Sequence, residues 1–177
     1  MKMKGLLKAA VRDPNPVLFF EPKKGYRLIK GEVPEDEEIL VPLGKAKVTR
    51  PGSDLTVFAY GMMHYYTLQA AEAVAQEGID VEVVDLRTLL PIDKETILSS
   101  VHKTSKALIV HEANLTGGYG AEIAAILADE AFTYLDAPIR RLGGPDVPAM
   151  PYSHPLQDWF MLDPDKIADA MRELAAF

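Results

Sequence analysis

The sequence predicts a three-layer α/β fold, in which a mostly parallel, five-stranded sheet has helices on both faces. The main observation is a repeated order of short, almost continuous apolar runs, each followed by a helix-length amphipathic segment. This order is typical of strand–helix–strand crossover units. The second observation is size: the chain has 177 residues, of which 48% are hydrophobic, enough for one domain with a sizeable core.

The alternation of strands and helices becomes regular after Gly52. Asp93 precedes one expected helix, and its carboxylate is suited to cap the first turn. Asp163 or Asp165 stands near the start of another. We expect an edge strand within residues 44–50 and further strands at 55–60, 79–86, 107–111 and 138–142. We expect helices at 62–76, from about 93 to 102, from the turn at 116–120 to Tyr134, and at 163–176.

The first part of the chain lacks this alternation. Residues 4–12 predict a helix, and residues 17–20 predict a short buried strand that Pro22 closes. The apolar face of that helix is expected to carry Leu6, Leu7, Ala10 and Val11. One helix and one strand cannot enclose a core, so this part is interpreted as the edge of a layer whose other members are missing.

We therefore divide the chain into three parts. Residues 1–21 are the remnant of another domain, residues 22–44 are a linker rich in proline, glycine and acidic residues, and residues 45–177 are the α/β domain. The acidic run at residues 35–38 is interpreted as a solvated loop.

Composition excludes several classes of function. The formal net charge is −7 and no basic patch stands out, so nucleic acid is not an expected partner. The chain has no cysteine, which excludes disulfides and thiolate metal sites and fits a cytoplasmic protein. Its apolar runs are only as long as strands, so membrane insertion is not expected either.

A glycine-rich turn precedes the expected helix that follows the third strand. Residues 116–120 read T-G-G-Y-G, and exposed amides at a helix start suit a phosphate. The spacing is that of neither a dinucleotide fingerprint nor a P-loop. Tight packing of the helix on the sheet is the favoured interpretation. The alternative is a free-standing flavodoxin-like module that binds a small ligand or phosphate.

Two pairs of polar residues end expected strands, where open α/β sheets place their sites. His111 and Glu112 offer a base and an acid, but neighbours on a strand point to opposite faces. A capping group and an interface group are therefore the favoured interpretation. Asp85 and Arg87 are suited to bind a ligand, to hold a loop or to make an intersubunit contact. The spacing of the four histidines predicts no zinc site.

Several segments together resemble the beta subunit of the E1 component of 2-oxoacid dehydrogenases, a member of the transketolase-like thiamine diphosphate enzymes. They follow the family order across essentially the whole chain, and PDVPAMP is more similar to branched-chain or acetoin-type members. The segments are KGLLKAAVRDPNPVLFFEPK, GEVPEDE, VPLGKAKV, GSDLTVFAYG, VEVVDLRTLLPID, LIVHEANLTGGYGAEIAA and DAPIRRLGGPDVPAMPYS.

The resemblance implies that residues 1–21 are the last helix and strand of a pyrimidine-binding domain. The catalytic and cofactor-binding residues of the family would then lie outside this chain. The parent reaction would be oxidative decarboxylation of a branched-chain 2-oxoacid or pyruvate on thiamine diphosphate and Mg²⁺, with acyl transfer to lipoyl-E2. A C-terminal domain of another transketolase-like enzyme is the remaining alternative.

The same resemblance implies sites and partners. The family's structural potassium ion maps in part onto Ala10, Asp13 and Asn15, whose oxygens suit a hard cation. The implied partners are an E1 alpha subunit, a second beta subunit and the E2 subunit-binding domain. There is one departure from the family pattern. The family tends to have a histidine at the position of Tyr65, whereas in this sequence the histidine stands one residue earlier, at His64. The interface candidates are His111, Glu112, Gly117, Gly118, Asp146 and Phe177.

Overall fold

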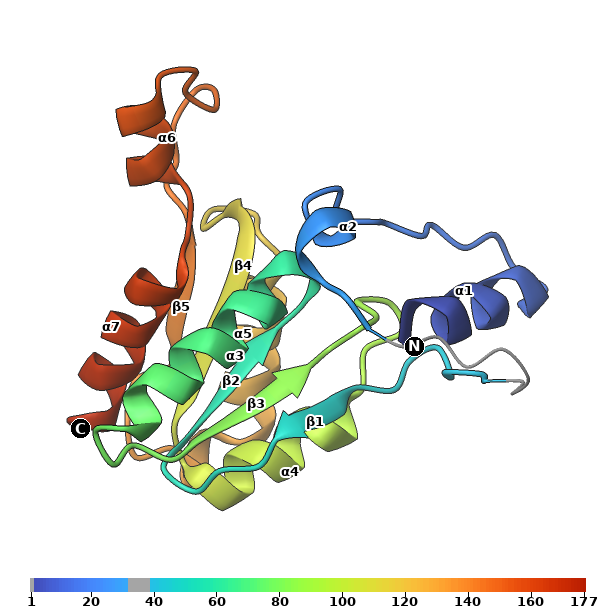
Figure 1. Cartoon of the computed structure of the whole chain (residues 1–177). Coiled ribbons are helices and arrows are strands. Elements are labelled where there is room, and N and C mark those ends of the chain that lie inside the picture. Colours follow the sequence, from blue (N-terminus) through green and yellow to red (C-terminus); the bar gives the residue numbers. More distant parts are fainter. Residues whose placement is uncertain (1, 32–38) are drawn as a thin grey trace.

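A twisted five-stranded sheet forms the centre of the molecule (Figure 1). The structure is a computed structural model and describes residues 2–31 and 39–177. The strands lie in the order β1-β3-β2-β4-β5. Their bounds are Lys47–Arg50 for β1, Leu55–Ala59 for β2, Val81–Asp85 for β3, Ala107–Asn114 for β4 and Arg140–Gly144 for β5.

Four of the strands are parallel, and β1 pairs with β3 in the antiparallel sense at one edge. The predicted α/β fold with a mostly parallel sheet is thereby confirmed. The helices are α1 at Lys2–Arg12, α2 at Gly25–Leu28, α3 at Gly61–Ala75, α4 at Lys94–Thr104, α5 at Gly120–Glu130, α6 at His154–Phe160 and α7 at Pro164–Ala175.

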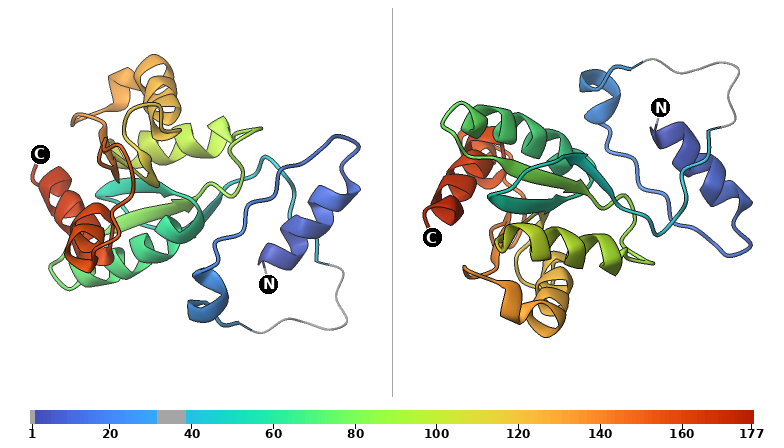
Figure 2. Two further views of the ribbon diagram at one scale, coloured as in Figure 1. Left: turned by 90° about the horizontal axis from the view of Figure 1, so that it is seen from above. Right: turned by 90° about the horizontal axis from the view of Figure 1, so that it is seen from below.

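Helices cover both faces of the sheet (Figure 2). All five residues of β2 are buried, because the strand is central and is covered on each side. Alternate side chains enter different cores. Leu55, Val57 and Ala59 pack with α3 and α7. Phe58 packs on the other side with α4 and α5.

Two carboxylates begin helices as predicted. Asp93 accepts a hydrogen bond from the Thr96 amide at 3.3 Å, and Asp163 accepts one from the Lys166 amide at 2.8 Å. The second oxygen of Asp93 also accepts the amide of Ala46 at 3.0 Å. Asp93 therefore caps α4 and joins it to the start of residues 44–177, which we call the sheet domain.

The structure corrects several boundaries. The helix expected to reach Tyr134 ends at Glu130, and a separate 3₁₀ turn spans Phe132–Tyr134. Strand β4 continues to Asn114, and β5 begins two residues later than predicted. The short helices α2 and α6 were not predicted, because four and seven residues carry little helical periodicity. The acidic run at 35–38 lies outside the described residues.

The expected strand at residues 17–20 is wrong: this segment pairs with no strand that the structure describes. Leu18 and Phe20 are 86% and 85% exposed. Helix α1 is present, but Leu7 and Val11 on its expected apolar face are also exposed. A strand needs a partner to satisfy its backbone groups, and none of the described strands lies beside this segment (Figure 1).

We call residues 2–31 and 39–43 the N-terminal arm. Its helix α1 is held at Gly5, where an added Cβ would lie 2.9 Å from Val41. The amide of Val41 also donates to the Gly5 carbonyl at 3.2 Å. The ammonium of Lys24 stands 5.2 Å from the ring centre of Tyr66 on α3, a cation–π distance.

Each helix in the described part of the chain is too short or too polar to cross a bilayer.

Candidate functional site

The polar residues of interest gather where the parallel strands end. Strands β2, β3, β4 and β5 run in the same direction, so their carboxyl ends meet at one edge of the sheet. Open α/β sheets place functional groups at this edge. Two groups of side chains occupy it here, one after β4 and one after β3.

The first group is built around His111, which is completely buried near the end of β4. Three glycines from two other segments close on its imidazole ring. A Cβ added at Gly118, Gly120 or Gly143 would lie only 2.6, 2.4 or 2.8 Å from a ring atom. Real side chains essentially never approach so closely, so a larger residue at any of these positions would have to displace the ring or the backbone. We call these four residues the histidine cage.

The hydrogen bonds of the cage define the form of the ring. Nδ1 of His111 lies 2.9 Å from the carbonyl oxygen of Ala113. Because a carbonyl can only accept, Nδ1 carries the proton and Nε2 has a free lone pair. Nε2 is buried without a hydrogen-bond partner among the described residues. Burial lowers the pKa of His111, and this effect outweighs the Ala113 hydrogen bond, which acts in the opposite sense.

The cage explains the G-G-x-G turn. The space that the glycines leave open at Gly118 and Gly120 is filled by the imidazole of His111. The first turn of α5 also carries Glu122, whose charge is unfavourable beside an anion. The turn therefore serves tight packing, the favoured interpretation, and does not fit the phosphate of a flavodoxin-like module. It fits the diphosphate of a thiamine cofactor no better.

The turn is tied to β5 and to the segment that follows it. The amide of Leu115 donates to the Gly144 carbonyl at 3.0 Å, and the hydroxyl of Thr116 donates to Asp146 at 2.5 Å. Arg141 donates to the Leu115 carbonyl at 2.9 Å. We call residues 112–120 and 143–146 the loop surface. Of the predicted interface residues, Glu112, Gly117 and Asp146 are exposed there, whereas Gly118 is buried within it and His111 lies beneath it.

Glu112 does not form a catalytic pair with His111. Its side chain is exposed, whereas that of His111 is completely buried. The charge of Glu112 is felt instead by Tyr60. Burial raises the pKa of the Tyr60 hydroxyl, and Glu112 and then Tyr119 raise it further. The alternation of strand side chains thus separates the histidine from the carboxylate.

The second group lies at the end of β3, where Asp85 and Arg87 meet His64 of α3 and Thr49 of β1. Nε2 of His64 lies 2.8 Å from the Thr49 hydroxyl, and its Nδ1 lies 4.0 Å from Asp85. Nε of Arg87 lies 3.8 Å from Asp85, and the Arg87 backbone has a φ of 60°. A left-handed conformation is uncommon for arginine. The sequence indicated Asp85 and Arg87, but the roles of Thr49 and His64 depend on the pairing of β1 with β3.

The predicted potassium ligands lie together at the end of α1, with Ala10 in its last turn and Asp13 and Asn15 just after it. The amide of Asp13 donates to the Ala10 carbonyl at 3.3 Å. The backbone and side-chain amides of Asn15 both donate to Asp13 Oδ1, at 2.9 and 3.0 Å. One carboxylate oxygen of Asp13 is thus already engaged. Within residues 2–31 and 39–177, no three His, Cys, Asp or Glu side chains gather as metal ligands would.

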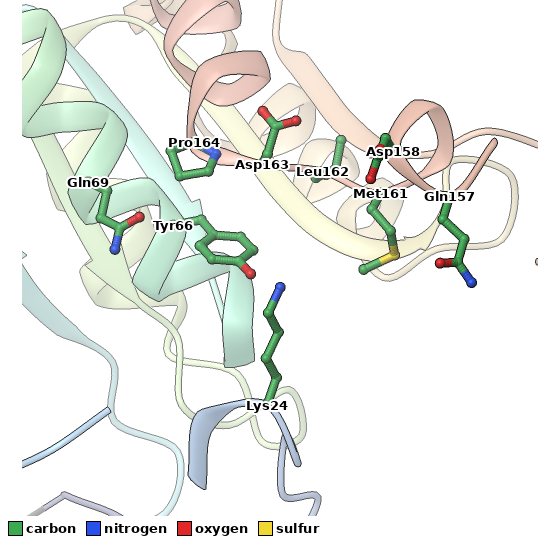
Figure 3. Close-up of a pocket in the computed structure, with 9 residues that line it drawn as sticks. All are labelled: Lys24, Tyr66, Gln69, Gln157, Asp158, Met161, Leu162, Asp163 and Pro164. Atoms are coloured by element: carbon green, nitrogen blue, oxygen red, sulfur yellow. The ribbon is translucent and has the colours of Figure 1, made fainter. Parts of the chain in front are cut away.

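Phe177, the remaining interface candidate, ends the chain after α7 and is 62% exposed. A separate open groove of about 440 Å³ lies between Tyr66 of α3 and the α6–α7 connection, with Lys24 of the N-terminal arm at its edge (Figure 3). The cap Asp163 also lines it. The groove lies apart from both polar groups and combines one lysine with two aspartates, Asp158 and Asp163.

Known proteins match almost the whole chain. It is 55% identical over 174 residues to the 2-oxoisovalerate dehydrogenase subunit beta of Bacillus subtilis, which covers 98% of this chain and 53% of that protein. It is 45% identical over 171 residues to the acetoin:2,6-dichlorophenolindophenol oxidoreductase subunit beta of the same organism, covering 97% and 49%. The chain thus spans about half the length of these relatives.

A solved structure described as a split gene transketolase, inactive beta4 tetramer, has the same fold. Its TM-score is 0.69 at 29% identity, and the match covers 81% of this chain and 47% of that one. Residues 44–167 match the family described as Transketolase, C-terminal domain. With its sheet, its helices and most of its length accounted for in this way, the chain belongs to the transketolase C-terminal domain family, and its relatives include E1 beta subunits of 2-oxoacid dehydrogenases.

Proposed function

We propose that this chain acts as part of the E1 beta subunit of a 2-oxoacid dehydrogenase and serves assembly rather than chemistry. The supporting observation is the 55% identity to a 2-oxoisovalerate dehydrogenase beta subunit along 98% of the chain. The parent enzyme would decarboxylate a branched-chain 2-oxoacid or pyruvate and pass the acyl group to lipoyl-E2. Thiamine diphosphate and Mg²⁺ would be its cofactors, held outside this chain.

The geometry at the strand ends supports a role in assembly. The imidazole of His111 is completely buried behind three glycines, whereas the side chain of Glu112 is exposed. A general base must reach the proton that it removes, and His111 cannot. The loop surface, by contrast, is held by three hydrogen bonds between the turn at residues 115–116 and residues 141–146, as a preorganised contact surface should be.

The proposed partners are an E1 alpha subunit and a second beta subunit. Under this proposal, residues 1–21 complete a pyrimidine-binding domain, residues 22–44 link it, and residues 45–177 form the assembly lobe. The exposed apolar side chains of the N-terminal arm, Leu18 and Phe20 among them, support a covered position in the assembly. Ala10, Asp13 and Asn15 would contribute oxygens to a potassium ion there.

The proposed site for the E2 subunit-binding domain is the end of α7. Phe177 presents an exposed ring after α7, and Asp169 and Glu173 add acidic groups to that helix. A net charge of −7 steers a basic partner toward the chain. The absence of cysteine fits the reducing cytoplasm in which we place this complex.

Two experiments test the proposal. The chain alone, supplied with 2-oxoacid, thiamine diphosphate and Mg²⁺, should release no CO₂, and measurable turnover without an alpha subunit would refute a purely assembling role. Binding to an E2 subunit-binding domain, measured by calorimetry, should weaken about tenfold or more when Phe177 is deleted. The matched control is Phe132→Ala, an exposed phenylalanine on another face, which should leave binding unchanged. Equal effects of the two variants would contradict docking at Phe177.

A further inference from the structure

The position of His111 couples three segments of the chain. Its ring projects from β4, lies against the turn that opens α5 at Gly118 and Gly120, and touches β5 at Gly143. With no exposed surface and contacts on three sides, the imidazole cannot turn toward solvent unless one of these segments moves. The ring therefore acts as a spacer around which the loop surface is assembled.

Only the neutral ring fits this space. Nδ1–H donates to the Ala113 carbonyl, and Nε2 faces Gly120, whose added Cβ would lie 2.5 Å away. A second proton would be placed on Nε2, which has no acceptor among the described residues. A buried cation without a partner is strongly unfavourable.

The charged groups around the ring do not offset this cost. Arg141 of β5 opposes protonation by its own positive charge. Among the carboxylates of the adjoining segments, Glu112 and Glu122 are exposed, and Asp146 is engaged by Thr116. None of these carboxylates bonds to the ring in the described structure. Protonation must therefore be accompanied by movement of the ring into solvent.

We propose that His111 is a pH-sensitive latch, which holds the loop surface in place while its imidazole is neutral and releases it when the imidazole is protonated. Release means that the ring leaves the cage and that residues 112–120 separate from residues 143–146. The latch is a property of this chain alone. That release would also weaken subunit contacts is a consequence that rests on the proposed function.

The direction of the effect follows from linkage. The released histidine has a pKa near its ordinary value of 6.5, and burial lowers the pKa in the latched state. The released state thus binds more protons than the latched one as the pH falls below 6.5. The latched arrangement is fully favoured above that pH and is lost progressively below it.

Hydrogen exchange of the whole 177-residue chain tests the latch. Protection factors of amides in residues 112–120 should fall below pH 6.5 by up to about tenfold per pH unit. Amides of β2 serve as an internal reference. In His111→Gln, which cannot titrate, the fall should disappear, and in the control His154→Gln, an exposed histidine, it should persist. Protection that is independent of pH in the unaltered chain, or that falls equally in His111→Gln, would overturn the proposal.

A second pair of variants tests the spacer role even where His111→Gln folds poorly. Gly120→Ala should lower the unfolding midpoint because its Cβ meets the imidazole, and His111→Ala in the same chain should restore part of the loss. Gly118→Ala should not be rescued, because its Cβ would also lie 2.2 Å from the Asn114 carbonyl oxygen. Strictly additive effects of Gly120→Ala and His111→Ala would contradict the cage. Neither readout involves an E1 or E2 partner, so failure here is distinguishable from failure of the proposed function.

Discussion

The sheet domain and the N-terminal arm use similar residues with opposite results. In the sheet domain, Leu55, Val57 and Phe58 are completely buried between helices. In the arm, Val11, Leu18 and Phe20 are 77%, 86% and 85% exposed. Apolar sequence alone therefore does not determine burial; the number of layers available to cover it does. The sheet domain encloses its own core, and the arm does not.

The largest difference between the two regions is expected for phenylalanine. Phe58→Ala leaves a cavity in a close-packed core and should lower the free energy of unfolding by about 3–5 kcal/mol. Phe20→Ala in the arm should change it by less than about 0.5 kcal/mol in the isolated chain, because little apolar surface is lost. Urea denaturation measures both. A cost for Phe20→Ala approaching that of Phe58→Ala would show that the arm is folded into a core.

A glycine in each region gives the next comparison. An added Cβ at Gly52 would lie 2.2 Å from the backbone of Val81, whereas at Gly31 it meets nothing within 4 Å. Gly52→Ala must displace β3 and should lower the free energy of unfolding by about 1–3 kcal/mol. Gly31→Ala should be neutral within about 0.5 kcal/mol. Thermal unfolding of the two variants decides whether close packing ends where the arm begins.

Two aspartates extend the comparison to capping groups. Asp93 caps α4 and accepts the amide of Ala46, so Asp93→Ala should cost about 1–2 kcal/mol. Asp13→Ala in the arm should cost less, because its hydrogen bonds come from Asn15 in the same exposed turn. Chemical denaturation of both variants at neutral pH measures the difference, and a larger loss for Asp13→Ala would contradict this account.

The Asp93 effect should depend on pH. Burial alone would raise the pKa of Asp93, but hydrogen bonds from Thr96 and Ala46 and the charge of Lys45 lower it below 3.8. The unfolded chain then binds the proton more readily. The difference in the free energy of unfolding between the unaltered chain and Asp93→Ala should be constant above about pH 5. It should shrink as the pH falls through 3.8.

Exposed ion pairs should matter least in either region. Arg172 of α7 donates to Glu77 at 2.6 and 2.8 Å, and this bond lowers the pKa of Glu77. Solvent screens such pairs, so Glu77→Gln should shift the urea midpoint only slightly, and less at high salt. In the arm, Glu21→Gln removes the charge of the carboxylate that accepts a hydrogen bond from the Tyr26 hydroxyl, and it should likewise shift the urea midpoint only slightly. A large effect of either variant would contradict the view that buried contacts dominate.

Local patterns predicted the sheet domain well. The apolar runs that became β2, β3 and β4 needed no knowledge of their neighbours, and the cap at Asp93 depends on residues only three positions away. The resemblance to E1 beta subunits was carried by many short segments and is confirmed by its relatives. Interface and potassium residues remain predictions.

Features that depend on distant segments could not be predicted. The histidine cage joins Gly118, Gly120 and Gly143 around His111, and the bond from Thr49 to His64 requires β1 to pair with β3. The strand expected at residues 17–20 failed for the related reason that strand propensity is expressed only beside a partner strand.

Hydrogen exchange of the isolated, monomeric chain tests most directly whether the sheet domain stands alone and the arm does not. Amides of β2 and β4 should exchange only on global unfolding, and amides of residues 17–21 should exchange at nearly the rate of an unstructured peptide. Adding an E1 alpha subunit should then protect the arm. Protection of residues 17–21 equal to that of β2 in the monomer would contradict the account.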